Sequence, residues 1–274
     1  MPSIAGTRVA LIGAGAVNFG GAEGPWDHAS RLEKLGAAQE KIDERRANKE
    51  FAHVWANTEV YADIQDMLDN VKPSAVFIGV PPSFHGCYKY PLELQVLRAG
   101  AHLFLEKPLS NAPVDEVTKY AAEVEALRKE KKLVVSVGYM FRYSLFGEKI
   151  KELLKGKKPV CLMARYNCTG ALGNLVHGAL LQGEAYDASV EIMADGLRIG
   201  VVKPYSETPT LKVLQGDSDE EVTFEFSGDD MYLTEDREFL KAVHGEGDDI
   251  RCQYQDAVNT YALTCKIRDV ALAN

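Results

Sequence analysis

Residues 8–15, Arg-Val-Ala-Leu-Ile-Gly-Ala-Gly, form a short apolar run that ends in a glycine turn. Such a run is typical of a buried strand that leads into a tight turn. Three further apolar runs follow, separated by helical patterns such as 91–99 and 114–127; these runs are 74–80, 102–105 and 133–137. Strands that alternate with helices indicate right-handed βαβ units and a parallel sheet. We therefore expect an α/β domain over residues 1–145.

The pattern changes after about residue 150. Turn-bounded strand patterns now follow one another, at 160–166, 172–181, 189–194, 197–202 and 222–226. Helical patterns return only at 235–243 and 256–270. Consecutive short strands separated by Gly, Asp and Pro favour antiparallel pairing. Residues 146–274 are therefore expected to form an α+β domain with an open-faced, mostly antiparallel sheet, and its last helix is expected to pack back on the first domain.

Composition narrows the possible partners. The chain has 274 residues, with 31 basic and 40 acidic side chains and a net charge of −9, which argues against nucleic-acid binding. It has no apolar run of the roughly 18–20 residues that a membrane helix needs and no visible secretory signal. The cysteines form no CxxC pair, and none of them lies near a histidine at metal-ligand spacing. We expect a cytoplasmic protein without a metal site.

The glycine turn is the first candidate for chemistry. In a dinucleotide-binding fold the first glycine makes the turn, and the second lets the backbone approach a pyrophosphate at a helix N-terminus. The motif here reads Gly13-Ala14-Gly15-Ala16-Val17-Asn18, with Asn18 in place of the third glycine. A glycine turn without any ligand gives the same pattern. The position of this turn directly after the first strand favours cofactor binding.

Two further motifs follow buried strands, where open α/β sheets bind ligands. Val80-Pro81-Pro82 leads to His85, which lies either on the surface or against a ligand. Glu106-Lys107-Pro108 places a lysine beyond the third strand. A lysine with a lowered pKa can act as a general acid and base, whereas a solvated Glu-Lys pair would only open a loop.

Together these motifs resemble the Gfo/Idh/MocA family of NAD(P)-dependent oxidoreductases, which includes glucose–fructose oxidoreductase and inositol dehydrogenase. The resemblance covers nearly all of residues 7–145, and the Glu-Lys-Pro element in this position is fairly specific, unlike the glycine motif. The other matching stretches are Gly13-Ala14-Gly15, Val80-Pro81-Pro82 with His85, Ala99-Gly100-Ala101-His102, Tyr139-Met140-Phe141-Arg142-Tyr143, and the tail at 235–243 and 254–257.

The resemblance implies a Rossmann domain, followed by a β-sheet domain through which a homodimer or tetramer would assemble. It implies that NAD or NADP is the cofactor, with its pyrophosphate held by the backbone of Gly13, Ala14, Gly15, Ala16 and Val17. Val80, Pro81, His85 and Pro108 would line the cofactor pocket, and Glu106 would lie near the nicotinamide ribose. Lys107 would be the catalytic lysine, and Arg142 would join it at the substrate.

The chain departs from the family pattern at two junctions. Two helical patterns meet across Gly36, where a second strand and its ribose-binding acid are expected. Asp43 is a weak substitute because it lies inside a helical run, so the choice between NAD and NADP stays open. After Asn167 the family's Asp and His pair is also missing, and His177 falls in a strand pattern. Either the natural chain is shortened near residues 36–37 and 168–171, or the protein has segments there that the printed sequence omits.

Three functions fit this sequence. The first is hydride transfer between NAD(P) and a sugar, a polyol or a related cyclic alcohol, with Lys107 as acid and base. The second is a catalytically inactive nucleotide-binding regulator or subunit on the same fold, as the missing Asp and His pair would suggest. The third is a redox-neutral reaction in which tightly held NAD oxidises and re-reduces one substrate.

Overall fold

The computed structural model describes residues 7–13, 16–19, 27–29, 31, 55–167, 187–216 and 220–273. The chain divides into two compact units, and each has its own sheet and core. The first unit comprises residues 1–140 and 232–265, and the second comprises residues 141–231 and 266–274. The Gly36 junction, Asp43 and His177 lie outside the described residues.

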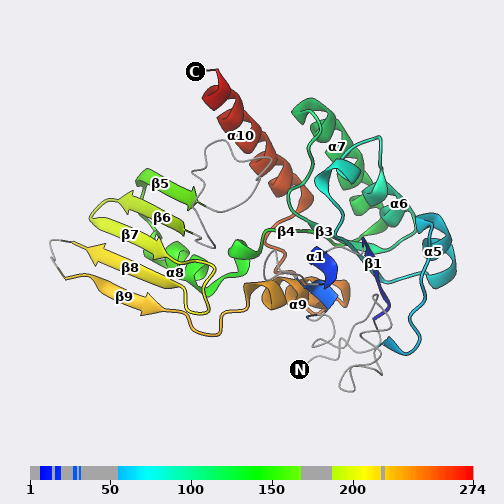
Figure 1. The fold of residues 1–274 in the computed structure, drawn as a ribbon, viewed down its shortest axis with the longest axis horizontal. Helices are drawn as coiled ribbons and strands as arrows, with labels where there is room; N and C mark the ends of the chain where they lie inside the picture. The colour runs from blue at the N-terminus through cyan, green and yellow to red at the C-terminus, as the bar shows by residue number, and fades with distance from the viewer. Residues whose placement is uncertain are drawn as a thin grey trace. The chain divides into compact units, whose positions relative to one another are not determined.

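The first unit contains the predicted parallel sheet, whose described residues form four strands in the order β1-β2-β3-β4 (Figure 1). The strands are β1 (Val9–Ile12), β2 (Ala75–Ile78), β3 (His102–Glu106) and β4 (Val135–Gly138). Nearly every strand residue is buried, as expected for a parallel sheet that is covered on both faces. The expectation of a parallel α/β sheet is therefore confirmed.

Helices cover the two faces of this sheet. One face packs against α5 (Ile64–Val71), α6 (Leu92–Arg98), α7 (Val114–Lys131) and the start of α10 (Tyr254–Leu272). The other face packs against α1 (Ala16–Phe19) and α9 (Met231–Val243). Alternate strand residues serve the two faces: Leu103 and Leu105 belong to the first core, and Phe104 belongs to the second.

The second unit contains a five-stranded antiparallel sheet in the order β5-β6-β7-β8-β9 (Figure 1). Its strands are β5 (Pro159–Asn167), β6 (Asp187–Ala194), β7 (Leu197–Val202), β8 (Thr210–Gln215) and β9 (Val222–Glu225). Helix α8 (Leu145–Leu153) packs on one face through Phe146 and Ile150. The antiparallel sheet was predicted from the sequence, but β8 and α8 were not. The strand expected at 172–181 lies outside the described residues.

Candidate active site

The predicted site residues of the first unit follow the carboxyl ends of three neighbouring strands. Ile12 of β1 pairs with Ile78 of β2, and Ile78 pairs with Leu105 of β3. Because the strands are parallel and in this register, the glycine turn, the loop after β2 and the Glu-Lys-Pro element start at the same sheet edge. Open α/β sheets bind their ligands at this edge.

The glycine turn is tightly packed against the segment that follows β2. Gly13 has a φ of +104°, and a Cβ atom there would lie 2.9 Å from the Gly79 carbonyl oxygen and from Val80 Cγ1. Only glycine fits this conformation and this space. Asn18 is fully buried, and its Nδ2 donates hydrogen bonds to the carbonyl oxygens of Ile12 at 3.1 Å and Gly13 at 2.7 Å. Asn18 therefore closes the turn.

Ala14 and Gly15 lie outside the described residues, and Ala16 and Val17 are placed only as the first residues of α1. Within the described part of the turn, Gly13 has a positive φ and lies close to the Gly79 backbone.

The loop after β2 buries His85. Val80 is half-buried and Pro81 is exposed, and a short 3₁₀ turn at Pro82–Phe84 leads into the histidine. Burial lowers the pKa of His85 to about 4, so its ring is neutral at pH 7. Among the described residues, neither ring nitrogen has a hydrogen-bond partner of good geometry.

A buried carboxylate holds this loop in place. Glu93 of α6 accepts a hydrogen bond from the Gly86 N–H at 2.7 Å, next to His85. It also accepts hydrogen bonds from the Tyr120 hydroxyl of α7 at 2.9 Å and from the Tyr254 hydroxyl of α10 at 3.1 Å. Burial raises the pKa of Glu93. The loop is thus tied to three helices of the first unit through one side chain.

Glu106, the last residue of β3, is fixed at both carboxylate oxygens. Its Oε1 lies 2.9 Å from Nε2 of His28, and its Oε2 accepts a hydrogen bond from the backbone N–H of Lys107 at 3.0 Å. Only 3% of Glu106 is exposed. The other ring nitrogen of His28, Nδ1, lies 3.0 Å from Oδ2 of Asp236 in α9. His28 thus bridges two buried carboxylates that come from β3 and α9.

Electrostatics keep His28 positively charged. Burial by itself would lower the pKa of His28, but the charge and hydrogen bond of Asp236, followed by those of Glu106, raise it to about 10. Burial is the main reason why the pKa of Asp236 is raised. The neighbouring Glu235 is also fully buried, and burial together with the Glu106 and Asp236 carboxylates raises its pKa well above the ordinary value.

Lys107 and Arg142 belong to different units. Lys107 is half-buried, and its peptide bond to Pro108, which is exposed, is cis. Arg142 is also half-buried and lies in a 3₁₀ turn at Met140–Tyr143, which leads into α8. In the first unit the structure therefore brings Gly13, Val80, the buried His85 and the Glu106-Lys107 pair to one sheet edge.

Reasoning from the sequence missed His28, Asp236 and Glu235. The sequence carried only part of the signal for them: Glu235 begins the tail stretch that resembles the family, but nothing there indicated a role for its side chain. His28 lies 78 residues before Glu106 and 208 residues before Asp236. No local spacing rule connects residues so far apart.

The described residues hold no cluster of His, Cys, Asp or Glu with an arrangement suited to a metal ion. None of the helices that the structure describes is both long enough and apolar enough to span a bilayer.

The fold and this sheet edge define a Rossmann-type nucleotide-binding protein. Comparison with known sequences shows which kind: residues 7–139 match the model of the Gfo/Idh/MocA group, described as an oxidoreductase family with an NAD-binding Rossmann fold. Residues 7–139 are therefore similar to this family, as the motifs indicated. The expectation of an oxidoreductase of NAD(P)-binding type is thus confirmed at the level of the family.

Individual relatives extend the comparison. The uncharacterised protein UNK4.17 of Schizosaccharomyces pombe is 29% identical over 374 residues, covering 96% of this chain and 91% of the relative. Because that alignment is longer than this chain, the relative has segments with no counterpart here. D-glucoside 3-dehydrogenase of Escherichia coli is 28% identical over 145 residues, covering 53% of this chain and 38% of the relative.

A solved structure supports the fold over most of the chain. The 3-ketoreductase KijD10 of Actinomadura kijaniata, crystallised with NADP and TDP-benzene, has a TM-score of 0.70 at 15% identity. The similarity covers 96% of this chain and 97% of that protein. It confirms a Rossmann domain followed by an antiparallel sheet domain.

Proposed function

We propose that the protein is an NAD(P)-dependent oxidoreductase that interconverts a hydroxyl and a carbonyl group on a sugar, a polyol or a related cyclic alcohol. The observation that carries this proposal is the position of Lys107. It directly follows β3 at the sheet edge where Gly13 makes its tight turn, and its backbone is held by the buried Glu106 carboxylate.

The residues at this edge fit a dinucleotide. A Cβ on Gly13 would collide with the Gly79 carbonyl oxygen, so the turn keeps the bare backbone that a pyrophosphate needs. The backbone from Gly13 to Val17, including Ala14, Gly15 and Ala16, would hold the pyrophosphate. Val80, Pro81, His85 and Pro108 would line the pocket, and Glu106 would face the nicotinamide ribose. Bound NAD(P) supplies a hydride acceptor or donor at nicotinamide C4.

Lys107 would move the proton of the reacting hydroxyl. In the oxidation direction its neutral amine takes the hydroxyl proton while the carbon–oxygen bond becomes a carbonyl and the carbon loses a hydride. In the reduction direction its ammonium returns that proton to the oxygen. A positioned acid or base of this kind contributes about 10²–10⁴ in rate. Arg142 would hold the substrate through its charge and its hydrogen-bond donors.

The substrate class rests on relatives. The Escherichia coli relative is named for a glucoside, and KijD10 is named a 3-ketoreductase. Both names describe chemistry at a hydroxyl or keto group. A ring that carries several hydroxyls is therefore the first substrate class to test.

The experiment compares Lys107→Ala with Lys119→Ala, a control that removes an exposed lysine from α7. NADH and NADPH fluorescence measures cofactor binding, and reduced-nicotinamide absorbance follows turnover with a panel of methyl glycosides and polyols. We expect K107A to keep cofactor affinity and lose about 10²–10⁴ in kcat, and K119A to match the wild type. Equal turnover in K107A contradicts the role of the lysine.

The same assay separates the other two functions. A nucleotide-binding regulator would bind NAD(P) and never change its absorbance with any substrate. A redox-neutral enzyme would leave the absorbance unchanged and still convert the substrate, which product analysis detects.

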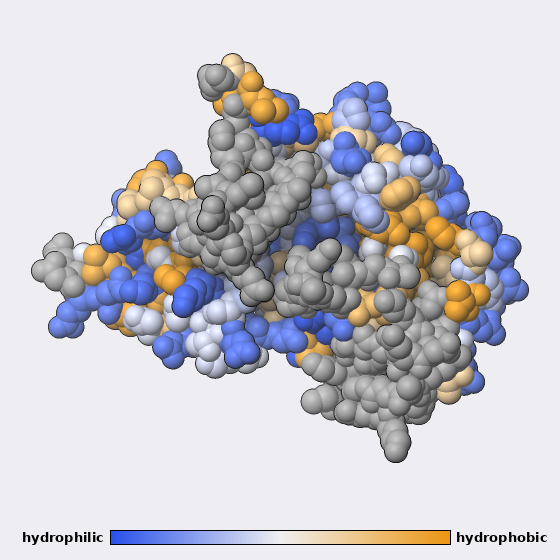
Figure 2. Space-filling view, in the orientation of Figure 1, coloured by the Kyte–Doolittle hydropathy of each residue, from blue (hydrophilic) through white to orange (hydrophobic). Residues whose placement is uncertain are grey.

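A second copy of the chain is the expected partner of the five-stranded sheet. The face of this sheet opposite α8 has a groove of about 340 Å³, whose lining includes Met163, Gly200 and the Lys212–Glu221 ion pair. Figure 2 shows hydrophilic and hydrophobic residues interspersed over the sheet region. Such mixed surfaces are typical of non-obligate interfaces. Light scattering of the purified protein tests whether it forms a dimer or a tetramer.

A further inference from the structure

Four ionisable side chains meet in the interior of the first unit. His28, Glu106, Glu235 and Asp236 are each at most 3% exposed, and they come from three separate parts of the chain. The aromatic rings of Phe77 and Phe104 surround the imidazole, with ring centroids 5.4 Å and 5.1 Å from it. The group therefore lies in an apolar environment, where charges interact strongly.

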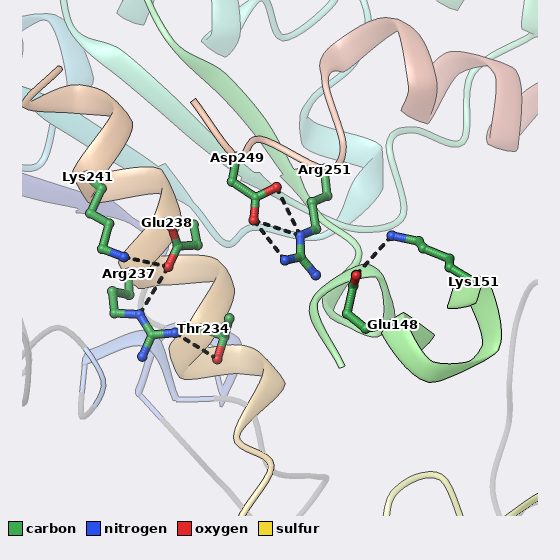
Figure 3. Close-up of polar contacts among 8 residues, drawn as sticks. All are labelled: Glu148, Lys151, Thr234, Arg237, Glu238, Lys241, Asp249 and Arg251. Atoms are coloured by element: carbon green, nitrogen blue, oxygen red, sulfur yellow. Dashed lines mark hydrogen bonds and ion pairs between the residues drawn. The ribbon is translucent and has the colours of Figure 1, made fainter. Parts of the chain in front are cut away.

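The half-buried charges of α9 behave differently. Figure 3 shows that Glu238 accepts hydrogen bonds from Lys241 at 2.9 Å and from Arg237 at 3.2 Å, along one side of the helix. These are ordinary ion pairs between neighbours on a helix, and each contributes little to stability. Glu235 and Asp236 occupy the buried side of the same helix, where no local cation of α9 pairs with them in the described structure.

Stability alone does not account for this buried group. Replacing a buried ion pair by apolar residues of similar volume is often neutral or stabilising, so such pairs are weak evidence for a stabilising role. Glu235 makes the arrangement less favourable, because neither of its carboxyl oxygens has a hydrogen-bond partner among the described residues. Groups kept in such an unfavourable state are typical of functional sites.

Geometry connects the group to Lys107. The imidazolium of His28 holds Oε1 of Glu106, and Oε2 of the same carboxylate accepts the backbone N–H of Lys107. Gly138 of β4 leaves the space for this carboxylate, since a Cβ there would lie 2.9 Å from Oε1. The chain of contacts therefore runs from Asp236 through His28 and Glu106 to the backbone of Lys107.

Charges around His28 nearly balance. The cations here, among the described residues, are the imidazolium of His28 and the guanidinium of Arg31, which lies 4.6 Å from the centre of the Tyr232 ring. They face Glu106 from β3 and Asp236 from α9. The raised pKa of Glu235 favours its neutral acid, so this third carboxyl adds no uncompensated charge.

We propose that His28 is a positioning residue for Lys107: anchored by Asp236, the imidazolium fixes the Glu106 carboxylate, and this carboxylate fixes the backbone from which the Lys107 side chain extends. The inference rests on the proposed function only in making Lys107 the group that is positioned. It adds a role for α9, which lies far from the Rossmann motifs in the sequence.

The first test measures amide hydrogen exchange at Lys107 by NMR. We expect His28→Gln to speed exchange at the Lys107 amide by roughly tenfold or more, because the carboxylate that holds this amide loses its anchor. Val124→Ala is the matched control: Val124 is fully buried in α7 on the opposite side of the sheet and touches none of these groups. If V124A speeds Lys107 exchange as much as H28Q does, the effect is global and the proposal is wrong.

The second test follows the protonation of His28 with ¹⁵N-labelled histidine. H28Q identifies its signal among the six histidines. We expect imidazolium signals in the wild type across about pH 6 to about pH 9, and titration at a clearly lower pH in Asp236→Asn. A wild-type His28 that titrates near its ordinary pKa overturns the proposal. Should H28Q fail to fold, D236N provides both the exchange and the titration measurements.

The two proposals fail in different ways. If K107A proves fully active while H28Q loosens the Lys107 amide, the acid–base role is wrong and the positioning contact stands. If K107A loses turnover while H28Q leaves the amide and kcat unchanged, the acid–base role stands and the positioning role is wrong. With both correct, H28Q lowers kcat more than it changes the KM for the methyl glycoside used.

Discussion

The buried imidazole of His28 should make the folded protein less stable as the pH rises from about 6.5 to about 10. Burial by itself would lower the pKa of His28, but Asp236 and Glu106 raise it from 6.5 to about 10 in the folded protein. The folded state thus holds this proton more tightly than the unfolded chain. The stabilisation is fully present below pH 6.5 and is lost as the pH rises through the folded pKa.

Glu235 acts in the same direction. Its pKa is raised well above 4.5, chiefly by burial, so the folded state keeps a proton that the unfolded chain has released at neutral pH. Stability therefore decreases with pH on this account too. For His28 alone, the difference between 6.5 and about 10 corresponds to about 5 kcal/mol of unfolding free energy, at about 1.4 kcal/mol for each pKa unit. His28 is fully buried, so solvent screening reduces this value little.

Urea unfolding at a series of pH values measures the effect. Trp55 is fully buried in the first unit, so its fluorescence follows the unfolding of that unit. Between about pH 7 and about pH 9.5, the unfolding free energy of the wild type should fall more steeply than that of His28→Gln, by up to about 1.4 kcal/mol per pH unit. Exposed groups titrate alike in both proteins, so the difference between the two slopes reports His28 together with the buried carboxyls coupled to it. Equal slopes would refute the reasoning.

Two further substitutions test the packing around the two buried carboxylates. Gly138→Ala places a Cβ 2.9 Å from Oε1 of Glu106 and should lower the unfolding free energy by about 1–3 kcal/mol, whereas the Cβ of Gly247→Ala meets no atom closer than 3.8 Å. Urea unfolding that finds the two variants equally stable would show that the carboxylate can move freely. Tyr254→Phe removes one of three hydrogen bonds to the buried Glu93 and should cost about 1–2 kcal/mol in the same assay, and an unchanged midpoint would mean that this hydrogen bond is not formed.

The first unit was predictable because its signals are local. Apolar runs predicted each of the four parallel strands to within a few residues, since strands that are buried on both faces read as continuous hydrophobic segments. The glycine turn and the Glu-Lys-Pro element are contiguous motifs at strand ends, so the sequence alone locates the sheet edge. The roles assigned to these residues remain predictions.

Two elements of the second unit were missed although the sequence carries their signals. Strand β8 alternates buried Leu211 and Val213 with exposed Lys212, which is the period of a half-buried strand. Helix α8 begins after Ser144, whose hydroxyl accepts a hydrogen bond from the Gly147 N–H as an N-cap. Both elements are short and lie between less regular segments, so their patterns were too brief to distinguish a strand or a helix from a loop.

The contacts of His28 were not predicted from the sequence for a different reason. An isolated histidine in a helical pattern has many possible environments, and its two carboxylate partners are 78 and 208 residues away. Only the tertiary fold determines that α9 crosses the face of the sheet on which Glu106 points. Periodicity predicts which side of α9 is apolar. It does not predict that two buried acidic residues, Glu235 and Asp236, lie on that side.

The two buried carboxylates near the sheet edge, Glu93 and Glu106, each hold the backbone of a loop through a hydrogen bond. Glu93 holds the loop that carries His85, and Glu106 holds the backbone of Lys107. Each of them depends on a residue from the last third of the chain: Tyr254 of α10 contacts Glu93, and Asp236 of α9 anchors the histidine that contacts Glu106. A parallel sheet by itself leaves the loops at its carboxyl edge without restraint, because ladder hydrogen bonds end with the strands.

Restraint of these loops therefore has to come from groups outside the sheet. Residues 1–140 alone would leave Glu106 next to a histidine that lacks its own carboxylate, and Glu93 would lose one of its two tyrosine hydroxyls. A buried acceptor without its donor costs about 1–3 kcal/mol, and a buried charge without its partner costs more. The site thus depends on helices that follow the second sheet in the sequence, which explains why contacts place 232–265 in the same unit as the Rossmann strands.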